Sequence, residues 1–323
     1  MNPTEIIAAD IGGTNARYAI ATIEGQKVTH LTPPITFPTA AHASLAASWA
    51  AFAQAVDRPL PRAAAIAVAC PLAGDVLAFT NNPWVLRRST LAAELNLGSL
   101  TLVNDFGAMG HALSQLKETD FLHLTGPESG LPETGAITLL GPGTGLGAAF
   151  VLRHAGQSHV VATEAGHQDF APLDPVEDAI LAHLRARFTR VSVERLISGP
   201  GLVNIFEALA AIDNHPSTPT DDKSLWNDAI GEKSPLATAA LFRFCQILGA
   251  AAGDLALAHG AAALVLTGGI APRIAKFLST SGFAARFCAK GRLQPQLAKI
   301  PVKLLAHPHP GLLGAAAAFA QER

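Results

Sequence analysis

The sequence predicts an α/β fold made of two related domains. Its 323 residues exceed what one hydrophobic core usually organises. Short apolar runs typical of strands recur along the chain, separated by longer segments with helical spacing of apolar residues. Two glycine-rich bends, one opening each half, lie between pairs of such runs. This weak internal repeat indicates two similar α/β domains, which we expect to face each other across a cleft.

The first half of the chain combines strand candidates with one alanine-rich helix candidate. Residues 5–10 and 16–22 are apolar runs joined by a glycine bend with Thr14 and Asn15, which predicts a strand, a turn and a strand. A helix is predicted at residues 41–56 from the spacing of its apolar side chains. Further strands are predicted at residues 63–70 and 100–103.

The second half repeats the strand, bend and strand pattern and then becomes mainly helical. Gly, Pro and Glu dominate residues 127–135, which predicts a loop, and residues 213–223 form a polar connector. The predicted strands are residues 136–140, 148–152, 262–267 and 302–305. The predicted helices are residues 174–188, 192–196, 202–212, 235–259 and 311–321, with one more directly after residue 269.

The charge and cysteine content exclude several classes of protein. The net charge is -2, the isoelectric point is about 6.6 and no run of Lys and Arg occurs, so we expect no nucleic-acid partner. The three cysteines, Cys70, Cys245 and Cys288, lie far apart without a C-x-x-C pair. They predict neither a disulfide framework nor a zinc site, and their odd number fits a reducing compartment.

Neither export nor membrane insertion is predicted. The N-terminal region has no basic segment followed by an apolar run and a small-residue cleavage site, so we expect a cytoplasmic protein. The most apolar long stretch, residues 236–263, is interrupted by Arg243, Gln246 and Asp254. A charge at the centre of a bilayer costs roughly 2.5–3.5 kcal/mol, which favours a buried helix over a membrane span.

The glycine bends are candidates for phosphate binding. Backbone N–H groups at such a bend can point together at an anion because no side chain keeps the anion away. Two ordinary β-turns are the alternative explanation. Two such bends between apolar strands, with a further pair, Gly268 and Gly269, directly after a strand, favour phosphate binding. Neither a G-x-G-x-x-G opening a helix nor a G-x-x-x-x-G-K-[ST] occurs, so a dinucleotide oxidoreductase and a P-loop enzyme are disfavoured.

Three segments resemble the nucleotide motifs of the hexokinase, actin and heat-shock-chaperone superfamily. Residues 10–17 (DIGGTNAR) resemble its phosphate-1 motif, residues 140–147 (LGPGTGLG) its phosphate-2 motif, and residues 267–273 (TGGIAPR) its adenosine motif. The resemblance implies a duplicated ribonuclease-H-like fold, also called the actin-like ATPase fold, with two domains around a cleft. It also implies ATP and Mg²⁺ as cofactors.

The intervening segments are similar to those of bacterial glucokinases in order and spacing, and the similarity covers nearly the whole chain. These segments are residues 69–74, 80–84, 103–106, 164–172, 192–204 and 309–314. Two residues depart from the family pattern: Ala165 stands where a glycine is usual, and Asn82 where a histidine is expected. A related repressor and kinase group shares the first bend but carries a cysteine-rich zinc motif, which this sequence lacks.

The resemblance implies ATP-dependent phosphorylation of D-glucose to glucose 6-phosphate, the first step of glycolysis, by a homodimer. It places the catalytic base at Asp105, which would accept the proton of the sugar hydroxyl. A turn or a helix N-cap is the alternative role for Asn104 and Asp105. Asp10 lies beside the first bend, where a carboxylate would repel phosphates unless a cation lay between them. We therefore expect Asp10 to organise Mg²⁺ through water, with a simple turn aspartate as the alternative.

The same resemblance implies the residues that bind the two substrates. Those expected to bind ATP are Asp10, Gly12, Gly13, Thr14, Asn15, Gly143, Thr144, Gly145, Gly268 and Gly269. Those expected to bind glucose are Asn104, Asp105, Glu164, His167 and Glu194. Carboxylates and amides suit sugar hydroxyls because they make directional hydrogen bonds. Taken alone, His167 could equally be a zinc ligand or a core histidine, and Glu194 could favour the first turn of a predicted helix through the helix dipole.

The domain boundaries follow from the same pattern. We expect a smaller first domain over about residues 1–110, completed by the C-terminal strand and helix at about 303–323, and a larger domain over about 111–302, with ATP and sugar between them. Two alternatives stay open: a kinase for another hexose or an amino sugar, and a sugar-sensing protein without catalysis. Asp105 favours an enzyme, because a protein that only binds sugar needs no base at that position.

Overall fold

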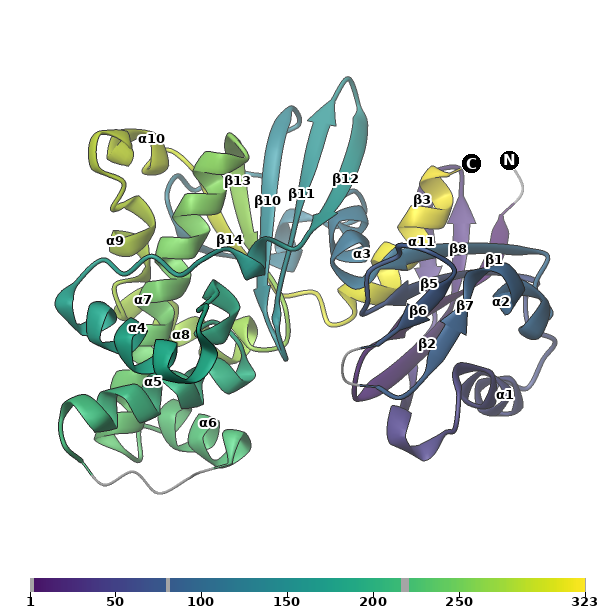
Figure 1. Cartoon of the computed structure of the whole chain (residues 1–323). Helices are drawn as coiled ribbons and strands as arrows, with labels where there is room; N and C mark the ends of the chain where they lie inside the picture. Colours follow the sequence, from purple (N-terminus) through teal and green to yellow (C-terminus); the bar gives the residue numbers. More distant parts are fainter. Residues whose placement is uncertain (1–2, 80–81, 216–220, 323) are drawn as a thin grey trace. The chain divides into compact units, whose positions relative to one another are not determined.

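The computed structural model describes residues 3–79, 82–215 and 221–322 (Figure 1). The first two residues of the segment 80–84 and the middle of the connector 213–223 lie outside the described residues. By its internal contacts the chain divides into two compact units. Unit 1 contains Met1–Lys117, Val160–Ala162 and His307–Arg323, and unit 2 contains Glu118–His159 and Thr163–Ala306.

Unit 1 is built on a six-stranded sheet in the order β3-β2-β1-β5-β8, with β4 pairing with β2. β1 and β2 form an antiparallel hairpin, whereas β1, β5 and β8 run parallel. The strands are β1 (Thr4–Ile11), β2 (Asn15–Glu24), β3 (Lys27–Leu31), β4 (Ile35–Pro38), β5 (Ala63–Val68) and β8 (Ser99–Asn104). The helices are α1 (Leu45–Ala55), α2 (Arg88–Glu94), α3 (Asp105–Ala112) and α11 (Pro310–Gln321), with a 3-10 turn η1 (Thr39–Ala41).

The central strand β1 is buried on both faces. Ile7 and Ala9 pack in a core with Phe52 of α1, whereas Ile6 and Ala8 belong to a second core with α11. Successive side chains of a strand point to opposite faces, so a strand covered on both sides needs an unbroken apolar run. This requirement explains the apolar sequence of β1. Because β1 is packed on both faces, the bend that follows it is attached to a rigid strand.

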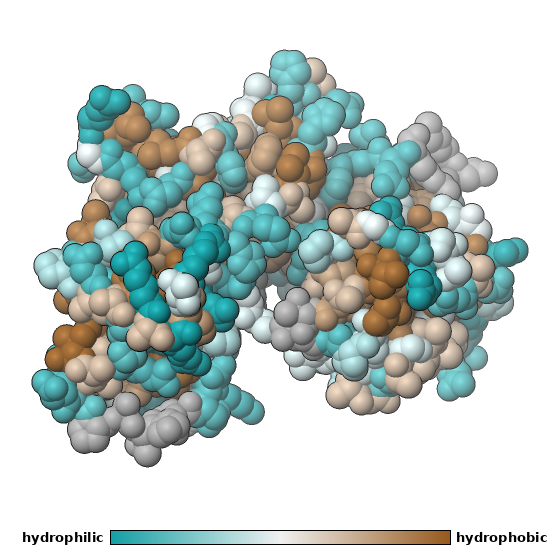
Figure 2. Space-filling view, viewed as in Figure 1, coloured by the Kyte–Doolittle hydropathy of each residue, from teal (hydrophilic) through white to brown (hydrophobic). Residues whose placement is uncertain are grey.

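A small two-stranded sheet of β6 (Val76–Ala78) and β7 (Val85–Arg87) has only one covered face. Leu77 and Leu86 pair with each other across the strands and are buried, whereas Val76 and Val85 are exposed. Figure 2 shows a hydrophobic patch on the face of unit 1 that carries these two strands. Period-two alternation of this kind is the pattern of a sheet with one buried face.

Unit 2 has a second six-stranded sheet, in the order β12-β11-β10-β13-β14-β9, of which only Val160–Ala162 in the edge strand β12 are grouped with unit 1. The strands are β9 (Phe121–Thr125), β10 (Gly135–Pro142), β11 (Leu146–His154), β12 (Gln157–Thr163), β13 (Ala261–Leu266) and β14 (Val302–Leu305). The helices are α4 (Pro175–Phe188), α5 (Gly199–Ile212), α6 (Asp222–Ile230), α7 (Pro235–Ala258), α8 (Ala275–Thr280), α9 (Phe283–Cys288) and α10 (Gln294–Leu297). Short 3-10 turns η3 (Ala165–His167) and η4 (Val193–Arg195) lie between β12 and α5.

The two sheets share one strand order. In unit 1 an antiparallel hairpin, β1–β2, is followed across the sheet by the parallel strands β5 and β8. In unit 2 the hairpin β10–β11 is followed in the same way by β13 and β14. Each glycine bend is the turn of its hairpin, so the repeat seen in the sequence extends to the sheet topology.

Helix α7 is long and apolar enough to cross a membrane by length and composition. In its most apolar window, however, 61% of the residues are buried inside the protein. Leu241, Phe244 and Leu248 lie within the hydrophobic core of unit 2. The helix therefore forms the centre of this core, as its interrupted apolar sequence predicted.

Two predictions of local structure differ from the structure. The last strand, β14, was predicted to complete the first domain, but it pairs with β13 and β9 in the sheet of unit 2, and only α11 lies in unit 1. Its four residues are all buried, which requires a central place in a sheet. The helix predicted at 192–196 is only the 3-10 turn η4, because α5 starts at Gly199 with Ser198 as its N-cap.

Candidate functional site

The first bend, residues 12–15, joins β1 to β2. It is closed by a hydrogen bond of 2.9 Å from the Gly12 amide to the Asn15 carbonyl. β1 and β2 are paired up to the bend itself, where Ile11 lies opposite Ala16. The predicted ATP residues Gly12, Gly13, Thr14 and Asn15 thus form one tight turn at the end of a buried hairpin.

Two buried residues outside the bend hold its carbonyl groups. The Thr39 hydroxyl donates to the Gly13 carbonyl at 2.8 Å, and the Thr39 amide donates to the Thr14 carbonyl at 2.9 Å. The Asn82 side-chain amide donates to the Gly12 carbonyl at 3.3 Å. Thr39 carries no recognisable sequence signal, because it reaches the bend only through the pairing of β4 with β2. Asn82 is one of the two residues that depart from the family pattern.

Asp10 lies at the end of β1, beside the first bend. Its side chain is 18% exposed and accepts a hydrogen bond of 3.3 Å from Arg17, its partner across the hairpin. Burial raises the pKa of Asp10, and the positive charge of Arg17 opposes this rise. A Cβ atom at Gly311, in the first turn of α11, would lie 2.8 Å from Cγ of Asp10, so only glycine leaves room for the carboxylate there.

The second bend, residues 143–145, joins β10 to β11 in unit 2. Its turn is closed by a hydrogen bond of 2.8 Å from the Gly143 amide to the Gly145 carbonyl. The Gly143 carbonyl accepts a hydrogen bond of 2.8 Å from Gly199, the first residue of α5. The N-terminus of α5 therefore lies against the bend that contains Thr144.

The predicted adenosine motif packs against the second bend. Gly268 has a φ of +83°, and a Cβ atom there would lie 2.6 Å from the Pro142 carbonyl oxygen. The Ile270 amide donates to the same carbonyl at 3.1 Å. Nothing lies within 4 Å of a Cβ atom placed on Gly269, so its backbone faces open space. Two motifs more than a hundred residues apart in sequence thus pack directly against each other in unit 2.

One predicted sugar residue of unit 2, Glu194, lies against the second bend, and His167 lies near it. Glu194, in η4, accepts a hydrogen bond of 2.9 Å from the Leu146 amide, and its second oxygen lies 3.9 Å from Nε2 of His167. Its carboxylate also lies against Gly145, where a Cβ atom would approach it to 2.5 Å. Glu164 precedes the turn η3, and its carbonyl accepts a hydrogen bond of 3.0 Å from the His167 amide.

The loop of residues 164–172, here called the sugar loop, is tightly packed where it turns. A Cβ atom at Gly166 would lie 2.2 Å from the Leu146 carbonyl oxygen, so glycine is required at that position. The Gln168 carbonyl accepts a hydrogen bond of 2.8 Å from Val193, and the Phe170 amide donates to Val191 at 3.0 Å. These bonds connect the sugar loop to the segment that carries Glu194.

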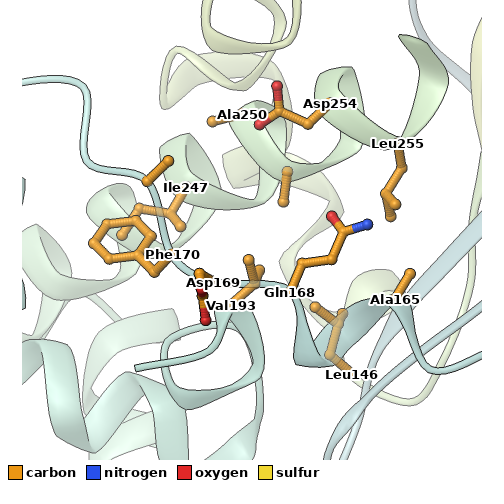
Figure 3. A pocket seen from close by; sticks show the side chains of 12 residues that line it. Leu146, Ala165, Gln168, Asp169, Phe170, Val193, Ile247, Ala250, Asp254 and Leu255 are labelled. Atoms are coloured by element: carbon orange, nitrogen blue, oxygen red, sulfur yellow. The ribbon is translucent and has the colours of Figure 1, made fainter. Parts of the chain in front are cut away.

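A small cavity of about 40 Å³ lies behind the sugar loop (Figure 3). Its walls are mainly apolar and include Leu146, Val193, Ile247 and Leu255, with Gln168 and Asp254 among the polar residues. None of the predicted sugar residues Glu164, His167 and Glu194 is among the lining residues. The cavity is thus distinct from the group of predicted sugar residues, although Leu146 and the sugar loop contribute to both.

Asn104 and Asp105 lie in unit 1 where β8 ends and α3 begins. Asn104 caps α3, because its side-chain oxygen accepts hydrogen bonds from Phe106 at 3.0 Å and from Gly107 at 3.2 Å. Its side-chain amide donates to the Cys70 carbonyl at 3.3 Å. Asn104 is therefore the N-cap of α3, whereas Asp105 occupies the first turn of the helix.

Asp105 is partly buried. Its carboxylate accepts a hydrogen bond of 2.9 Å from the Phe106 amide. Burial raises the pKa of the nearby Cys70 thiol to about 11, and the negative charge of Asp105 adds to this rise. Cys70 is consequently a neutral thiol at ordinary pH.

The described residues contain no group of three or more His, Cys, Asp or Glu side chains able to hold a metal ion. His167 therefore has no set of partner ligands within this part of the chain, which disfavours a zinc site there. A single carboxylate such as Asp10 still fits Mg²⁺, which keeps most of its waters and takes further oxygen ligands from substrate phosphates.

Comparison with known proteins identifies the family. The family model described as Glucokinase matches residues 7–322. The chain is 55% identical over 318 residues to a protein named glucokinase from Zymomonas mobilis, which covers 98% of both chains. The structure of the present chain is similar to that of a glucokinase from an Antarctic psychrotroph. The TM-score is 0.84 at 34% identity, and the match covers 97% of this chain and 98% of that one.

A more distant structure shares the fold. It is a ROK family glucokinase from Streptomyces griseus in complex with glucose and AMPPNP, with a TM-score of 0.60 at 18% identity, covering 97% of this chain and 98% of that one. The mixed α/β fold is thus common to sugar kinases of low sequence identity. The chain described here belongs to the glucokinase family.

Proposed function

We propose that this chain transfers the γ-phosphoryl group of ATP to the 6-hydroxyl of D-glucose. The observation that carries the proposal is the full-length similarity to a named glucokinase at 55% identity. The product would be glucose 6-phosphate, and the reaction would supply the first step of glycolysis in the cytoplasm. The geometry of the bends and of the predicted sugar residues supports this reaction class.

The bends are suited to the triphosphate of ATP. Thr14 and Thr144 each stand in a tight turn between paired strands, where backbone N–H groups can converge on an anion. The N-terminus of α5 adds a favourable helix dipole at Gly143. AMPPNP, an ATP analogue, is bound by the Streptomyces griseus protein, which supports ATP as the donor. Gly269 would admit the adenosine because its backbone faces open space, and Gly268 would hold the adenosine motif close against the second bend.

Asp10 would hold Mg²⁺ through water. Its side chain is partly exposed beside the first bend and faces one guanidinium, that of Arg17. When bound, Mg²⁺ neutralises charge on the phosphates of ATP. Asp10 and the first bend would then fix the position of the phosphates without a direct clash of like charges.

Five side chains would bind the sugar: Asn104, Asp105, Glu164, His167 and Glu194. Glu194 and His167 already lie within 3.9 Å of each other, as two residues that share one ligand would. The His167 side chain is 56% exposed and that of Glu194 29%, so both can reach a sugar hydroxyl. A site built from such groups rejects an analogue that lacks a hydroxyl, because its own polar atoms would stay unpaired.

Asp105 would be the catalytic base. Its carboxylate would accept the proton of the 6-hydroxyl while the sugar oxygen forms a bond to the γ-phosphorus and the bond to the leaving ADP breaks. Asn104 already caps α3, so the carboxylate of Asp105 is not needed for that purpose. This separation of roles supports a catalytic function for Asp105 over a structural one.

The proposed function also implies a fold type, a division into domains and an oligomeric state. We infer a duplicated ribonuclease-H-like fold of the actin-like ATPase type, supported by the strand order common to both sheets. Units 1 and 2 would be its two domains, with α11 and not β14 completing the first. A homodimer is inferred from the family resemblance alone.

One assay tests the proposed function and its alternatives together. Purified protein is mixed with Mg-ATP and a panel of hexoses and amino sugars, and release of ADP is measured. We expect the highest kcat/KM with D-glucose. A higher kcat/KM with another sugar would show that the chain is a kinase for that sugar. Glucose binding without ADP release would show that it is a sugar sensor without catalysis.

A further inference from the structure

The carbonyl groups of three successive residues in the first bend each accept a hydrogen bond from Thr39 or Asn82. Asn82 donates to the Gly12 carbonyl at 3.3 Å, and the Thr39 hydroxyl donates to the Gly13 carbonyl at 2.8 Å. The Thr39 amide donates to the Thr14 carbonyl at 2.9 Å. Thr39 therefore determines the orientation of two of the three peptide groups.

The orientation of a carbonyl also determines that of the next amide. A trans peptide group is planar, and its N–H points opposite to its C=O. The bond from Thr39 to the Gly13 carbonyl thus directs the Thr14 N–H to the opposite side of the bend. The bond from Asn82 does the same for the Gly13 N–H. Neither of these two amides donates a hydrogen bond to another of the described residues.

Thr39 is well placed to hold this arrangement. It directly follows β4, whose last residue, Pro38, lies opposite Asn15 on β2. Its side chain is β-branched and 3% exposed, so few rotamers are open to it. The side chain of Asn82 is held as well, since its oxygen accepts a hydrogen bond of 3.0 Å from the Trp84 amide. The two donors to the bend are therefore both buried and rigid.

We propose that Thr39 is a positioning residue for the nucleotide, whose hydroxyl turns the Thr14 amide toward the phosphates. The proposal rests on the proposed function, because it takes the anion at the first bend to be a phosphate of ATP. Amides that are oriented before the anion arrives need no reorganisation when it binds. A residue that does not touch ATP would thus determine how strongly the bend binds it.

A purely structural role for Thr39 makes a different prediction. A buried hydroxyl that only supports the hairpin would lower the melting temperature when removed and leave the KM of the folded enzyme for ATP unchanged. A positioning role raises the KM for ATP and leaves the affinity for glucose nearly constant, because the hydroxyl directs only the amides of the bend. Comparing the change in KM for ATP with the change in affinity for glucose therefore distinguishes the positioning role from the structural role.

The test compares three substitutions in the full-length protein. Thr39→Val keeps the shape and removes the hydroxyl, and Thr39→Ser keeps the hydroxyl. Thr29→Val is the matched control, because Thr29 is exposed on β3 and its hydroxyl also donates to a backbone carbonyl, that of Thr22, at 3.3 Å. KM for Mg-ATP and for glucose, kcat and melting temperature are measured for each. Affinity for Mg-AMPPNP is measured by calorimetry.

We expect Thr39→Val to raise KM for ATP and the Kd for AMPPNP by about three- to tenfold, the range that one hydrogen bond commands. KM for glucose should change less than about twofold, Thr39→Ser should restore most of the nucleotide affinity, and Thr29→Val should change neither. Unchanged nucleotide affinity in folded Thr39→Val would overturn the proposal. If that variant does not fold, Thr39→Ala is used, and failure of both to fold would also overturn it.

Failure of the proposed reaction and failure of the positioning role give different results. Wild-type protein that binds Mg-AMPPNP but releases no ADP with any sugar would contradict the proposed reaction. A weaker binding of AMPPNP by Thr39→Val in that same protein would still support the positioning role.

Discussion

The carboxylate of Glu194 accepts a hydrogen bond of 2.9 Å from the backbone amide of Leu146. Leu146 is the first residue of β11 and directly follows Gly145, so this bond ties a predicted sugar residue to the predicted phosphate bend. The other oxygen of the same carboxylate faces His167 at 3.9 Å. One side chain thus connects the parts of unit 2 assigned to the two substrates.

The two contacts of Glu194 can be separated by substitution. Glu194→Gln keeps an oxygen that can accept from Leu146 but loses the charge, so we expect KM for glucose to rise by roughly tenfold with KM for ATP almost unchanged. Glu194→Ala also leaves the Leu146 amide without its partner, and both KM values should rise. Steady-state kinetics check this, with Glu207→Gln, at a partly exposed acid of the same unit, as control. Equal effects of the two substitutions on KM for ATP would contradict the assigned contact.

Asp10 is expected to affect turnover more than sugar binding. Asp10→Asn removes the charge assigned to Mg²⁺ while an oxygen remains to accept from Arg17. We expect kcat to fall by about 10²-fold, the scale for loss of one electrostatic contact to the transition state, with glucose affinity nearly unchanged. Measuring kcat beside a glucose titration checks this, and Asp57→Asn, at an exposed acid of unit 1, is the control. A comparable loss of both quantities would refute this division of roles.

A partly buried charge cluster just beyond the sugar loop predicts a pH-dependent stability. Asp174 pairs with Arg243 at 2.5 Å and with Arg286 at 3.3 Å, and Arg286 also pairs with Glu177, which is fully buried, at 2.6 Å. Burial acts to raise the pKa of Asp174, but hydrogen bonds from Glu177 and Arg243 and the two arginine charges outweigh it and lower that pKa. The ionised form of Asp174 thus stabilises the folded state above its unfolded pKa.

The corresponding substitution is Asp174→Asn, which retains an oxygen for the N-cap of α4. We expect it to cost about 1–2 kcal/mol of stability near neutral pH. The difference from wild type should shrink as pH falls below about 4, because the wild-type carboxylate then gains a proton. Melting temperatures measured across this range check it, with Asp178→Asn in the same helical turn as control. A difference that stays constant with pH would show that the charge is not responsible.

Regular strands were predicted better from the sequence than the turns and short elements. The strands of both hairpins were predicted because each is buried on both faces or nearly so, which requires a continuous apolar run. The helix predicted at 192–196 was wrong, since apolar spacing over five residues cannot distinguish one 3-10 turn from an α-helix. The place of β14 was also wrong, because strand pairing between distant segments leaves no local signal.

The candidate site shows the same limit. Glycine bends and their flanking acids can be recognised locally, and the structure brings the second bend, Gly268 and Glu194 together in unit 2. Thr39 could not be predicted, because its contact with Gly13 depends on the pairing of β4 with β2. Its position after Pro38 indicates only a turn.

Asp105 carries the central claim, that the chain is a kinase whose base is this carboxylate. Asn104 provides the N-cap of α3, so Asp105→Ala should leave the fold intact and cost only the small stabilisation that an acid gains in the first turn of a helix, about 0.3–1 kcal/mol. The most direct measurement is kcat of Asp105→Ala with Mg-ATP and glucose, set beside its melting temperature and a glucose titration. We predict a fall in kcat of roughly 10²–10⁴ with only modest loss of glucose affinity. A well-folded Asp105→Ala protein with near-wild-type kcat would contradict the mechanism.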